Sequence, residues 1–214
     1  MAKKTEIIKV NLHDVEKEKI TRIVKVLRQG GLIIYPTETF YGLGVNCFIK
    51  ESIQRIYGLK KRDYSKPISL VVSDMEMVET VAVDIPDVFR TLAGEFWPGP
   101  LTLILKASPR LPRELRGEGS AAVRIPDLFW LQELIKEAGF PLTATSANLS
   151  GEKEIYRPEE ITANFYGKVD LIVDGGRTPG VRPSTVVDLT AEKPKIIREG
   201  IISRSALKNY ITSL

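Results

Sequence analysis

Short apolar runs alternate with amphipathic segments of helical period along almost the whole chain of 214 residues. Apolar side chains repeat at helical spacing over residues 14–29, with Asp14 as the predicted N-cap and Gly30-Gly31 as the stop, and a buried strand is predicted over residues 32–35. Since successive strand–helix units bury both faces of a sheet, this alternation predicts an α/β or α+β fold with a twisted open mixed sheet. No repeat, low-complexity segment or long linker divides the chain, so residues 1–214 are predicted to form a single domain.

The remaining segments continue the same alternation. The polar segment 108–119 is rich in proline, arginine and glycine, and it is predicted to be a mobile lid rather than a domain boundary. Helices are predicted over 50–59, 74–82, 86–97 and 127–139 and from Ser203 onwards, and apolar strands or runs over 43–48, 67–73, 101–107, 121–125, 169–176, 184–189 and 195–199, with a short strand opening the segment 141–151.

A single cysteine and a single histidine limit the chemistry that the chain can carry out. Cys47 alone cannot form a disulfide framework, and together with His13 it supplies too few soft ligands for a zinc site. The scarcity of histidine also argues against a Ser-His-Asp triad. A Cys47–His13 dyad is formally possible but disfavoured, because His13 lies in a polar N-terminal stretch and Cys47 in a strand-like one.

Net charge is modestly positive, at +4 with an isoelectric point near 9.1, and basic residues gather at Lys60, Lys61, Arg62 and Lys66. This balance suits a polyanionic ligand such as a nucleotide or a nucleic acid, although a solvated charged surface has the same composition. No apolar run approaches the ~18 residues of a membrane span, and the segment MAKKTEIIKV lacks the apolar core of a signal peptide. A cytoplasmic protein with no membrane partner is therefore expected.

No standard phosphate-binding loop is present, since neither G-x-x-x-x-G-K-[ST] nor G-x-G-x-x-G occurs. Four polar segments at strand ends are the remaining candidates for a ligand site. In PTETFYGLG (36–44), Thr37 and Thr39 offer hydroxyls to a ligand, although the same residues suit a tight turn. In KKRDYSKP (60–67), Lys60 and Arg62 could point to one side and neutralise phosphates, or could belong to a solvated helix end.

The other two segments are equally open to two interpretations. In GSAAVRIPD (119–127), Arg124 sits inside an apolar strand and needs an anionic partner, either a structural carboxylate or a substrate. In TATSANLSGE (143–152), side-chain oxygens either cap the following turn or serve a polyphosphate. The polar residues of this last segment are Thr143, Thr145, Ser146, Asn148 and Ser150.

In combination, these segments resemble a known family. PTETFYGLG, the K-x-R of KKR before KP, WPGPLTLIL, AVRIPD, TSANLSG and STVVDL have the order and spacing of the YrdC-like threonylcarbamoyl-AMP synthases, over about residues 15–205. The resemblance implies a large, positively charged concave cleft and the short, single-domain form of the family. It also implies a nucleotidyltransferase that converts ATP, L-threonine and bicarbonate or CO₂ into threonylcarbamoyl-AMP and pyrophosphate. That product serves tRNA modification next to the anticodon through separate threonylcarbamoyl-transfer proteins, with weak or indirect contact to tRNA.

The resemblance also implies roles for individual residues. Lys60 and Arg62 would be exposed in the cleft, offset the triphosphate charge and act in catalysis. Mg²⁺ would accompany ATP and be held mainly by phosphate oxygens and water, with Asp63 and Glu38 as the candidate carboxylates. The threonine site would comprise Thr37, Arg124 and Thr143, and the ATP site Lys60, Arg62, Ser120, Thr145, Ser146, Asn148, Ser184 and Arg198.

Two positions depart from the family pattern. Pro183 precedes STVVD where many members have glutamate, and Glu199 stands in REG where many have proline. Two other functions are compatible with the same features. One is a double-stranded RNA or tRNA-binding module that uses the basic cleft. The other is the related carbamoyl-transfer domain of hydrogenase maturation proteins, whose usual acylphosphatase and zinc-finger-like segments do not occur in this sequence.

Overall fold

One open mixed sheet has the strand order β1-β8-β2-β3-β7-β4-β6-β5-β9-β10, in a computed structural model that describes residues 4–180 and 182–211. The predicted mixed α/β fold is therefore confirmed. The strands are β1 (Glu6–Lys9), β2 (Ile33–Pro36), β3 (Tyr41–Gly44), β4 (Ser69–Val71), β5 (Leu101–Lys106), β6 (Ser120–Arg124), β7 (Leu142–Ser146), β8 (Leu171–Asp174), β9 (Thr185–Asp188) and β10 (Lys195–Arg198).

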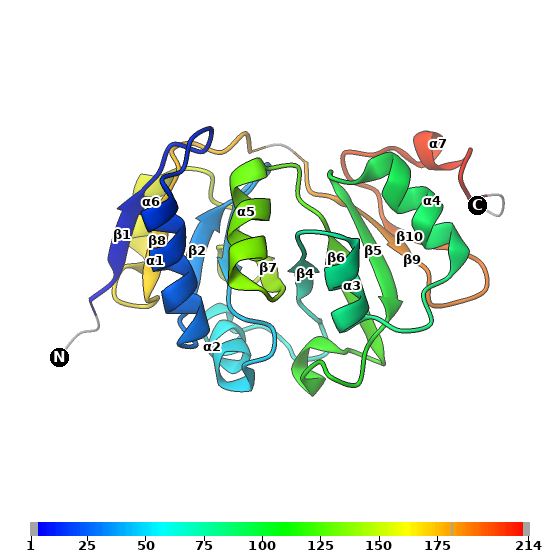
Figure 1. Cartoon of the computed structure of the whole chain (residues 1–214), viewed down its shortest axis with the longest axis horizontal. Coiled ribbons are helices and arrows are strands. Elements are labelled where there is room, and N and C mark those ends of the chain that lie inside the picture. The colour runs from blue at the N-terminus through cyan, green and yellow to red at the C-terminus, as the bar shows by residue number, and fades with distance from the viewer. Residues whose placement is uncertain (1–3, 181, 212–214) are drawn as a thin grey trace.

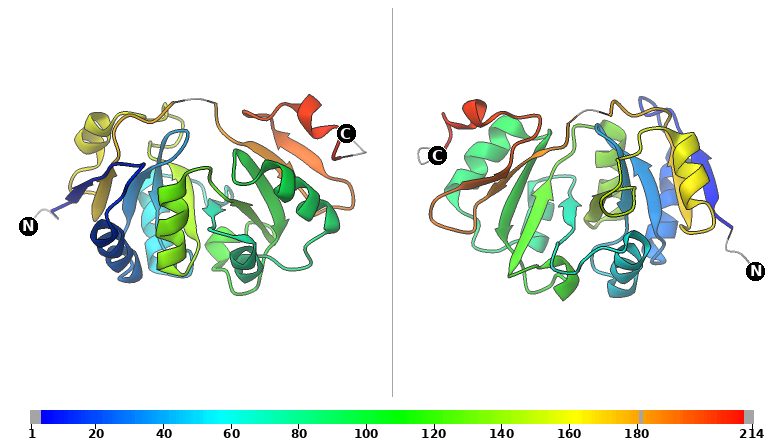
Figure 2. Two further views of the ribbon diagram at one scale, coloured as in Figure 1. Left: turned by 45° about the horizontal axis from the view of Figure 1, so that its top comes forward. Right: turned by 180° about the vertical axis from the view of Figure 1, so that it is seen from behind.

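The helices lie unevenly on the two faces of the sheet. Figures 1 and 2 show α1, α5, α3 and α4 along one face and α6 on the opposite face, with α2 near the lower edge of the view in Figure 1. Their bounds are α1 (Lys17–Arg28), α2 (Lys50–Lys60), α3 (Met75–Val81), α4 (Asp87–Phe96), the 3-10 turn η1 (Arg113–Leu115), α5 (Phe129–Ala138), α6 (Pro158–Phe165) and α7 (Arg204–Leu207). Among the described residues, none of these helices has the length and apolar character needed to cross a bilayer.

Strand β7 joins the two halves of the sheet. It pairs antiparallel with β3, where Gly42 lies opposite Ser146, and antiparallel with β4, where Ser69 lies opposite Ala144. Strand β6 then pairs in parallel with β4, with Val71 opposite Arg124. Polar positions that are far apart in the sequence are thereby brought onto neighbouring strands at the centre of the sheet.

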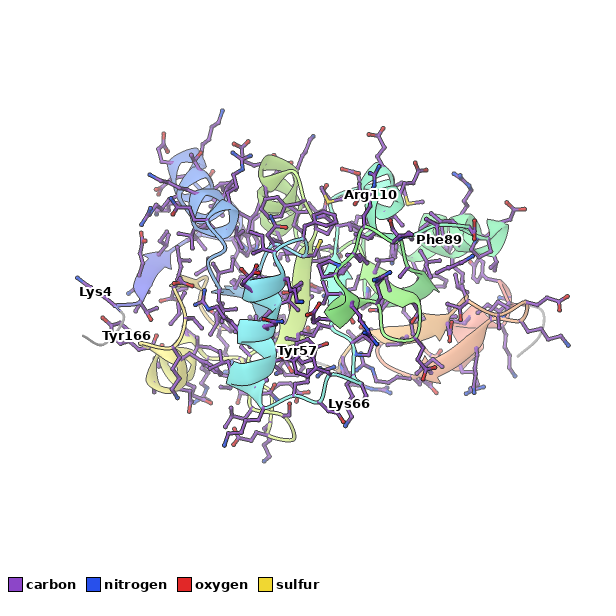
Figure 3. All side chains as sticks on the ribbon, turned by 90° about the horizontal axis from the view of Figure 1, so that it is seen from below. Lys4, Tyr57, Lys66, Phe89, Arg110 and Tyr166 are labelled. Atoms are coloured by element: carbon purple, nitrogen blue, oxygen red, sulfur yellow. The ribbon has the colours of Figure 1, made fainter. Side chains whose placement is uncertain are left out.

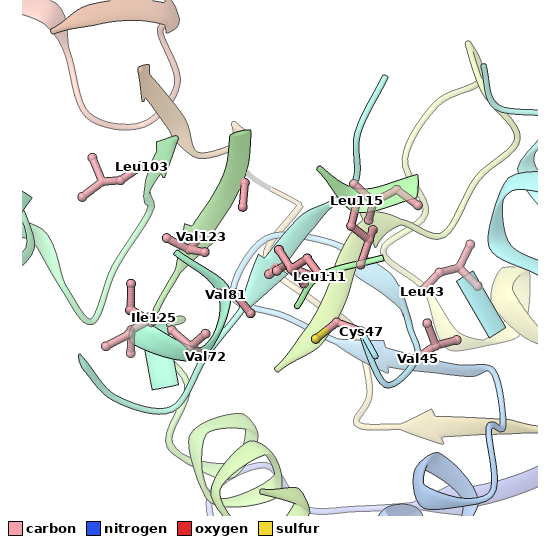
Figure 4. Packing of buried hydrophobic residues seen from close by; sticks show 14 of the residues in the cluster. Leu43, Val45, Cys47, Val72, Val81, Leu103, Leu111, Leu115, Val123 and Ile125 are labelled. Carbon is pink, nitrogen blue, oxygen red and sulfur yellow. The ribbon is translucent and has the colours of Figure 1, made fainter. Parts of the chain in front are cut away.

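Two apolar clusters hold the helices to the sheet. In the first, α1 and α5 pack against each other and against the strand residues Ile33, Tyr35 and Leu171. The second and larger cluster includes residues of α2, α3, α4 and α6, and Figure 4 shows part of it around Leu43, Val45 and Cys47. Burial raises the pKa of the Cys47 thiol, so Cys47 behaves as a core side chain and not as the nucleophile of a dyad.

Several element boundaries differ from the sequence prediction. β1 and α6 were not predicted, because the side chains of β1 alternate between exposed and half-buried and α6 buries few residues. α1 begins after Glu16 and not at Asp14, since Asp14 lies in a turn in which its N–H donates to the carbonyl of Asn11 at 3.0 Å. α5 likewise begins at Phe129, two residues later than predicted.

The predicted lid, residues 108–119, is fastened to the core. Leu111 and Leu115 are each 1% exposed and belong to the larger apolar cluster. The N–H groups of Leu111 and Leu115 donate to the carbonyls of Ser108 and Pro112 at 3.1 and 3.0 Å. The apolar side chains therefore pin a segment that its polar composition alone made to look mobile.

Candidate functional site

A cavity of about 220 Å³ opens beside the centre of the sheet. Its walls come from the loop between β2 and β3, from β4, β6 and β7, from the loop after α2, and from the segments around residues 154, 184 and 198. Of the predicted site residues, Thr37, Arg62, Arg124, Thr145, Ser146, Ser184 and Arg198 line this cavity, whereas Lys60, Ser120, Thr143 and Asn148 do not. The sequence prediction therefore brought together residues from six separate segments, whereas four predicted residues lie outside the cavity wall.

The loop between β2 and β3 is a tight turn that also lines the cavity. The Thr37 hydroxyl donates to the carbonyl of Phe40 at 2.7 Å, accepts from the N–H of Thr39 at 3.2 Å, and lies 3.0 Å from the Thr39 hydroxyl. After the turn, β3 crosses the ring of Tyr35 so closely that a Cβ at Gly44 would lie 2.5 Å from Cε1 of that ring. The two interpretations of this segment are therefore compatible: its hydroxyls shape the turn, and the turn presents them at the wall of the cavity.

Arg124, at the end of β6, is 8% exposed and lines the cavity. Its guanidinium forms an ion pair with the carboxylate of Glu38, from the same turn that carries Thr37 and Thr39. Burial lowers the pKa of Arg124 to about 10, which still leaves it cationic at neutral pH. Of the two partners left open by the sequence, a structural carboxylate is present, and the ion pair ties β6 to the turn between β2 and β3.

Arg62 is held by the loop that follows α2. Its Nε donates to the carbonyl of Lys66 at 2.8 Å and its Nη2 donates to the carbonyl of Pro67 at 3.1 Å. The Tyr57 hydroxyl donates to the same Lys66 carbonyl at 3.3 Å, and Figure 3 shows Tyr57 on α2 beside this loop. Because the guanidinium has five N–H donors, these contacts orient Arg62 while leaving donors for a ligand in the cavity.

Lys60 was predicted to be exposed, and this prediction is wrong: the residue is 2% exposed. Its Nζ donates to the carbonyls of Ser146 and Asn148 at 2.5 and 2.7 Å and to Oδ1 of Asn148 at 2.9 Å. Burial, with repulsion from Arg62, lowers the pKa of Lys60 to about 8. The sequence did not reveal this burial, because it depends on the turn after β7 folding back over the last residue of α2.

The turn after β7 separates residues that line the cavity from residues that lie behind it. Thr145 and Ser146 line the cavity, whereas Asn148 is 7% exposed and does not. The Asn148 side chain accepts from the Ser146 hydroxyl at 2.7 Å and donates to the carbonyl of Glu152 at 2.6 Å. The turn is therefore built by its own side chains, as one of the two interpretations of this segment expected.

Thr143 and Ser120 lie away from the cavity wall. Thr143 is fully buried on β7, where its hydroxyl accepts from the N–H of Val45 at 3.0 Å and donates to the carbonyl of Leu43 at 3.4 Å. Ser120 is the first residue of β6 and Arg124 the last. Four strand residues span about 13 Å, so Ser120 lies at the other end of β6 from Arg124, and its place in an ATP site stays a prediction.

Thr143→Val is expected to lower the free energy of unfolding by about 1–3 kcal/mol, because the buried N–H of Val45 would lose its partner. In the pyrophosphate-release assay, the KM for threonine should change less than about twofold, because the substitution destabilises the fold without removing a side chain from the cavity wall. Denaturant unfolding and initial rates measure both quantities. The comparison variant is Thr145→Val, which removes a hydroxyl at the cavity wall and should affect the KM for ATP more than stability. A Thr143→Val variant of unchanged stability with a raised KM for threonine would place Thr143 in the threonine site.

Ser184 and Arg198 line the cavity from the segment before β9 and from the end of β10. Nε and Nη2 of Arg198 donate to the carbonyl of Ser184 at 3.2 and 3.0 Å, and the Ser184 hydroxyl lies 2.9 Å from that of Thr102. The two departures from the family pattern, Pro183 and Glu199, lie next to this contact, but they leave both side chains at the cavity. A Cβ at Gly200 would lie 2.1 Å from the carbonyl oxygen of Pro183, so only glycine allows this close approach of the two segments.

The charged residues of the cavity wall are three arginines, at positions 62, 124 and 198, and one carboxylate, Glu154. Glu154 is not among the predicted site residues, because it follows the TSANLSG motif in a run of charged residues. Among the described residues, no three histidine, cysteine or acidic side chains form a group that could hold a metal ion. Of the candidate magnesium ligands, Glu38 pairs with Arg124 and Asp63 accepts from the N–H of Ser65 at 2.9 Å. The large positively charged cleft stays a prediction.

Comparison with known proteins identifies the family. Residues 25–200 match the Sua5/YciO/YrdC family, which is described as telomere recombination. The chain belongs to this family. Over 198 residues it is 37% identical to the threonylcarbamoyl-AMP synthase of Pyrococcus abyssi, and over 205 residues it is 34% identical to the putative threonylcarbamoyl-AMP synthase of Methanocaldococcus jannaschii.

The share of the relative's length that aligns with this chain differs between the two Sua5/YciO/YrdC relatives. The aligned residues make up 92% of this chain and 58% of the P. abyssi protein, but 94% of this chain and 96% of the M. jannaschii protein. A crystal structure of P. abyssi Sua5 complexed with L-threonine superposes with a TM-score of 0.93 at 36% identity, covering 98% of this chain and 62% of that one. The chain thus spans little more than half of the P. abyssi enzyme.

Proposed function

We propose that this chain is a nucleotidyltransferase that makes threonylcarbamoyl-AMP from L-threonine, bicarbonate or CO₂, and ATP, with release of pyrophosphate. One observation carries the proposal: hydroxyls and a buried arginine suited to an amino acid share a single cavity with two further arginines suited to a triphosphate, the half-buried Arg62 and the exposed Arg198. The names of the relatives and the threonine complex of P. abyssi Sua5 support it. The product would pass to threonylcarbamoyl-transfer proteins for tRNA modification, in the cytoplasm.

The threonine side of the cavity would be formed by Thr37, Thr39 and Arg124. Arg124 would hold the substrate carboxylate, because a planar guanidinium donates two parallel hydrogen bonds to it. The ion pair with Glu38 would keep the guanidinium in place before threonine arrives. Held by its carboxylate, threonine would keep its amine free to react with CO₂, which forms a carbamate and releases one proton.

The ATP side would be formed by Arg62, Thr145, Ser146, Ser184 and Arg198. A carbamate oxygen would attack the α-phosphorus while pyrophosphate leaves in line, so that one P–O bond forms as another breaks. Arg62 and Arg198 would stabilise the charge that develops on the phosphate oxygens, and no protein nucleophile is required. At about 220 Å³ the cavity is smaller than the roughly 300–1,000 Å³ of pockets that enclose a drug-sized ligand, so part of the nucleotide would lie outside it.

Magnesium would enter as the complex with ATP. The donor set of the cavity fits an ion held mainly by phosphate oxygens and water, because Glu154 is the carboxylate on its wall. The magnesium ion would offset triphosphate charge together with the arginines. Glu154 itself lies near Lys60 and Arg198, whose positive charges it partly balances.

The test is pyrophosphate release by the purified protein from ATP, with bicarbonate and magnesium, in the presence and absence of L-threonine. Release that depends on threonine, and that serine supports poorly, is the expected result. Intact ATP binding without threonine-dependent release would overturn the proposal. In that case RNA binding that ATP and threonine fail to compete away would favour the RNA-binding module in its place.

Glu154→Gln is expected to tighten the binding of magnesium-free ATP roughly three- to tenfold, because it removes one negative charge that faces the phosphates. Isothermal calorimetry at low ionic strength, with and without magnesium, measures the change. Glu152→Gln, on the same exposed segment but outside the cavity wall, is the matched control. Weaker binding of magnesium-free ATP by the Glu154 variant would show that the phosphates lie elsewhere.

A further inference from the structure

The ammonium group of Lys60 has no donor left for a ligand. Its three protons are matched by three protein oxygens, at 2.5, 2.7 and 2.9 Å, all from Ser146 and Asn148. The backbone carbonyl of Lys60 also accepts from the N–H of Ser150 at 3.1 Å. A single residue at the end of α2 therefore grips the turn 146–150 through both its side chain and its main chain.

The hydrogen bonds of Lys60 also fix the side chain of Ser146, which lines the cavity. Oδ1 of Asn148 accepts from Lys60 and also, at 2.7 Å, from the hydroxyl of Ser146. Ser146 lines the cavity, but Lys60 and Asn148 lie behind it. Lys60 and Asn148 thus form an inner pair, and Arg62 and Ser146 form an outer pair at the cavity wall.

We propose that Lys60 is a positioning residue: it holds the turn 146–150 in the shape that presents Ser146 to the nucleotide, and it does not contact phosphate itself. This inference rests on the proposed function, because it assigns the turn to the nucleotide side of the cavity. A buried ammonium that left these oxygens for a phosphate would give up three hydrogen bonds, among them the one to the main-chain carbonyl of the buried Asn148. The charge of Lys60 therefore acts through Asn148 and the turn.

A double-mutant cycle of Lys60→Met and Asn148→Ala tests the inference, with kcat and both KM values from pyrophosphate release. Lys60→Met should lower kcat roughly 100-fold and raise the KM for ATP, because the reacting groups are misplaced, while the KM for threonine stays within about twofold. The double variant should be about as impaired as the worse single variant, because both changes break the same support. A residue needed only for folding would lower the active fraction without moving the KM for ATP.

The inference would be overturned if the fold-loss of activity in the double variant equalled the product of the fold-losses in the two single variants. Lys60 and Asn148 would then act independently. An unchanged KM for ATP in Lys60→Met would also overturn the inference. Lys61→Met is the matched control, because it removes the neighbouring exposed ammonium outside the cavity and should leave the rates unchanged. If Lys60→Met does not fold, Lys60→Gln takes its place in the cycle.

The inference and the proposed function can fail separately. If the wild-type protein releases no pyrophosphate in response to threonine, the same cycle can be carried out on the Kd for ATP by calorimetry. Coupled losses of ATP affinity would then support the positioning role even though the proposed reaction is wrong. Independent losses would remove the positioning role whatever the reaction.

Discussion

Arg124→Lys should raise the KM for L-threonine roughly 10- to 100-fold, because an ammonium group replaces the planar guanidinium that donates two parallel hydrogen bonds to the threonine carboxylate. Lysine keeps the positive charge beside Glu38, so the variant should still fold. Arg124→Ala would instead leave the buried Glu38 carboxylate without its partner, a change that typically costs about 3–5 kcal/mol of stability. Lysine is therefore the informative substitution.

Threonine titrations at saturating ATP measure this effect. Arg198→Lys is the matched control, since Arg198 is another arginine of the same cavity wall and contacts Ser184. It should change the KM for ATP and leave the KM for threonine unaltered. An Arg124→Lys variant with the threonine dependence of the wild type would remove Arg124 from the threonine site.

Arg62→Ala should lower kcat/KM for ATP on the order of 10³-fold, the size of effect seen when an arginine that stabilises a transferring phosphoryl group is removed. Arg62 is well placed for this role, because its own loop carbonyls hold Nε and Nη2 and its remaining donors face the cavity. The fold should survive, since the lost hydrogen bonds are to carbonyls of Lys66 and Pro67 in a largely exposed loop.

Rates over a range of ATP concentrations, together with thermal unfolding, separate these two claims. Lys61→Ala removes a cation one residue away that is exposed and outside the cavity wall, so it should behave as the wild type. Activity within tenfold of the wild type in Arg62→Ala would contradict the assignment of Arg62 to the phosphates.

Periodicity and motif spacing predicted most of the order of strands and helices along the chain. Polar segments predicted at strand ends do supply residues to one cavity. Arg124 is the clearest case: an arginine inside an apolar strand demanded an anionic partner, and Glu38 supplies one. Lys60 is the clearest failure. A lysine beside Lys61 and Arg62 at a helix end looks solvated in the sequence, and only the folded path of residues 146–150 covers it.

The other misses have similar causes. β1 has a polar edge-strand pattern and is specified mainly by its pairing with β8, which no local window contains. Thr143, which the family resemblance assigned to the threonine site, has a hydroxyl that accepts from the N–H of Val45 in the neighbouring segment, so its role at a ligand stays a prediction. In each case the deciding partner is about a hundred residues or more away in the sequence, beyond the reach of local patterns.

Strand order also governs when this chain can fold during its synthesis. β8 lies between β1 and β2, so Leu171 pairs with both Glu6 and Ile33. The first strands made by the ribosome must therefore wait for residues 171–174 to emerge before their edges are satisfied. Closing such long loops before any contact compensates makes folding slow, and it leaves exposed strand edges on the nascent chain. An N-terminal fragment that ends before β8 is accordingly expected to aggregate, not to fold as half a domain.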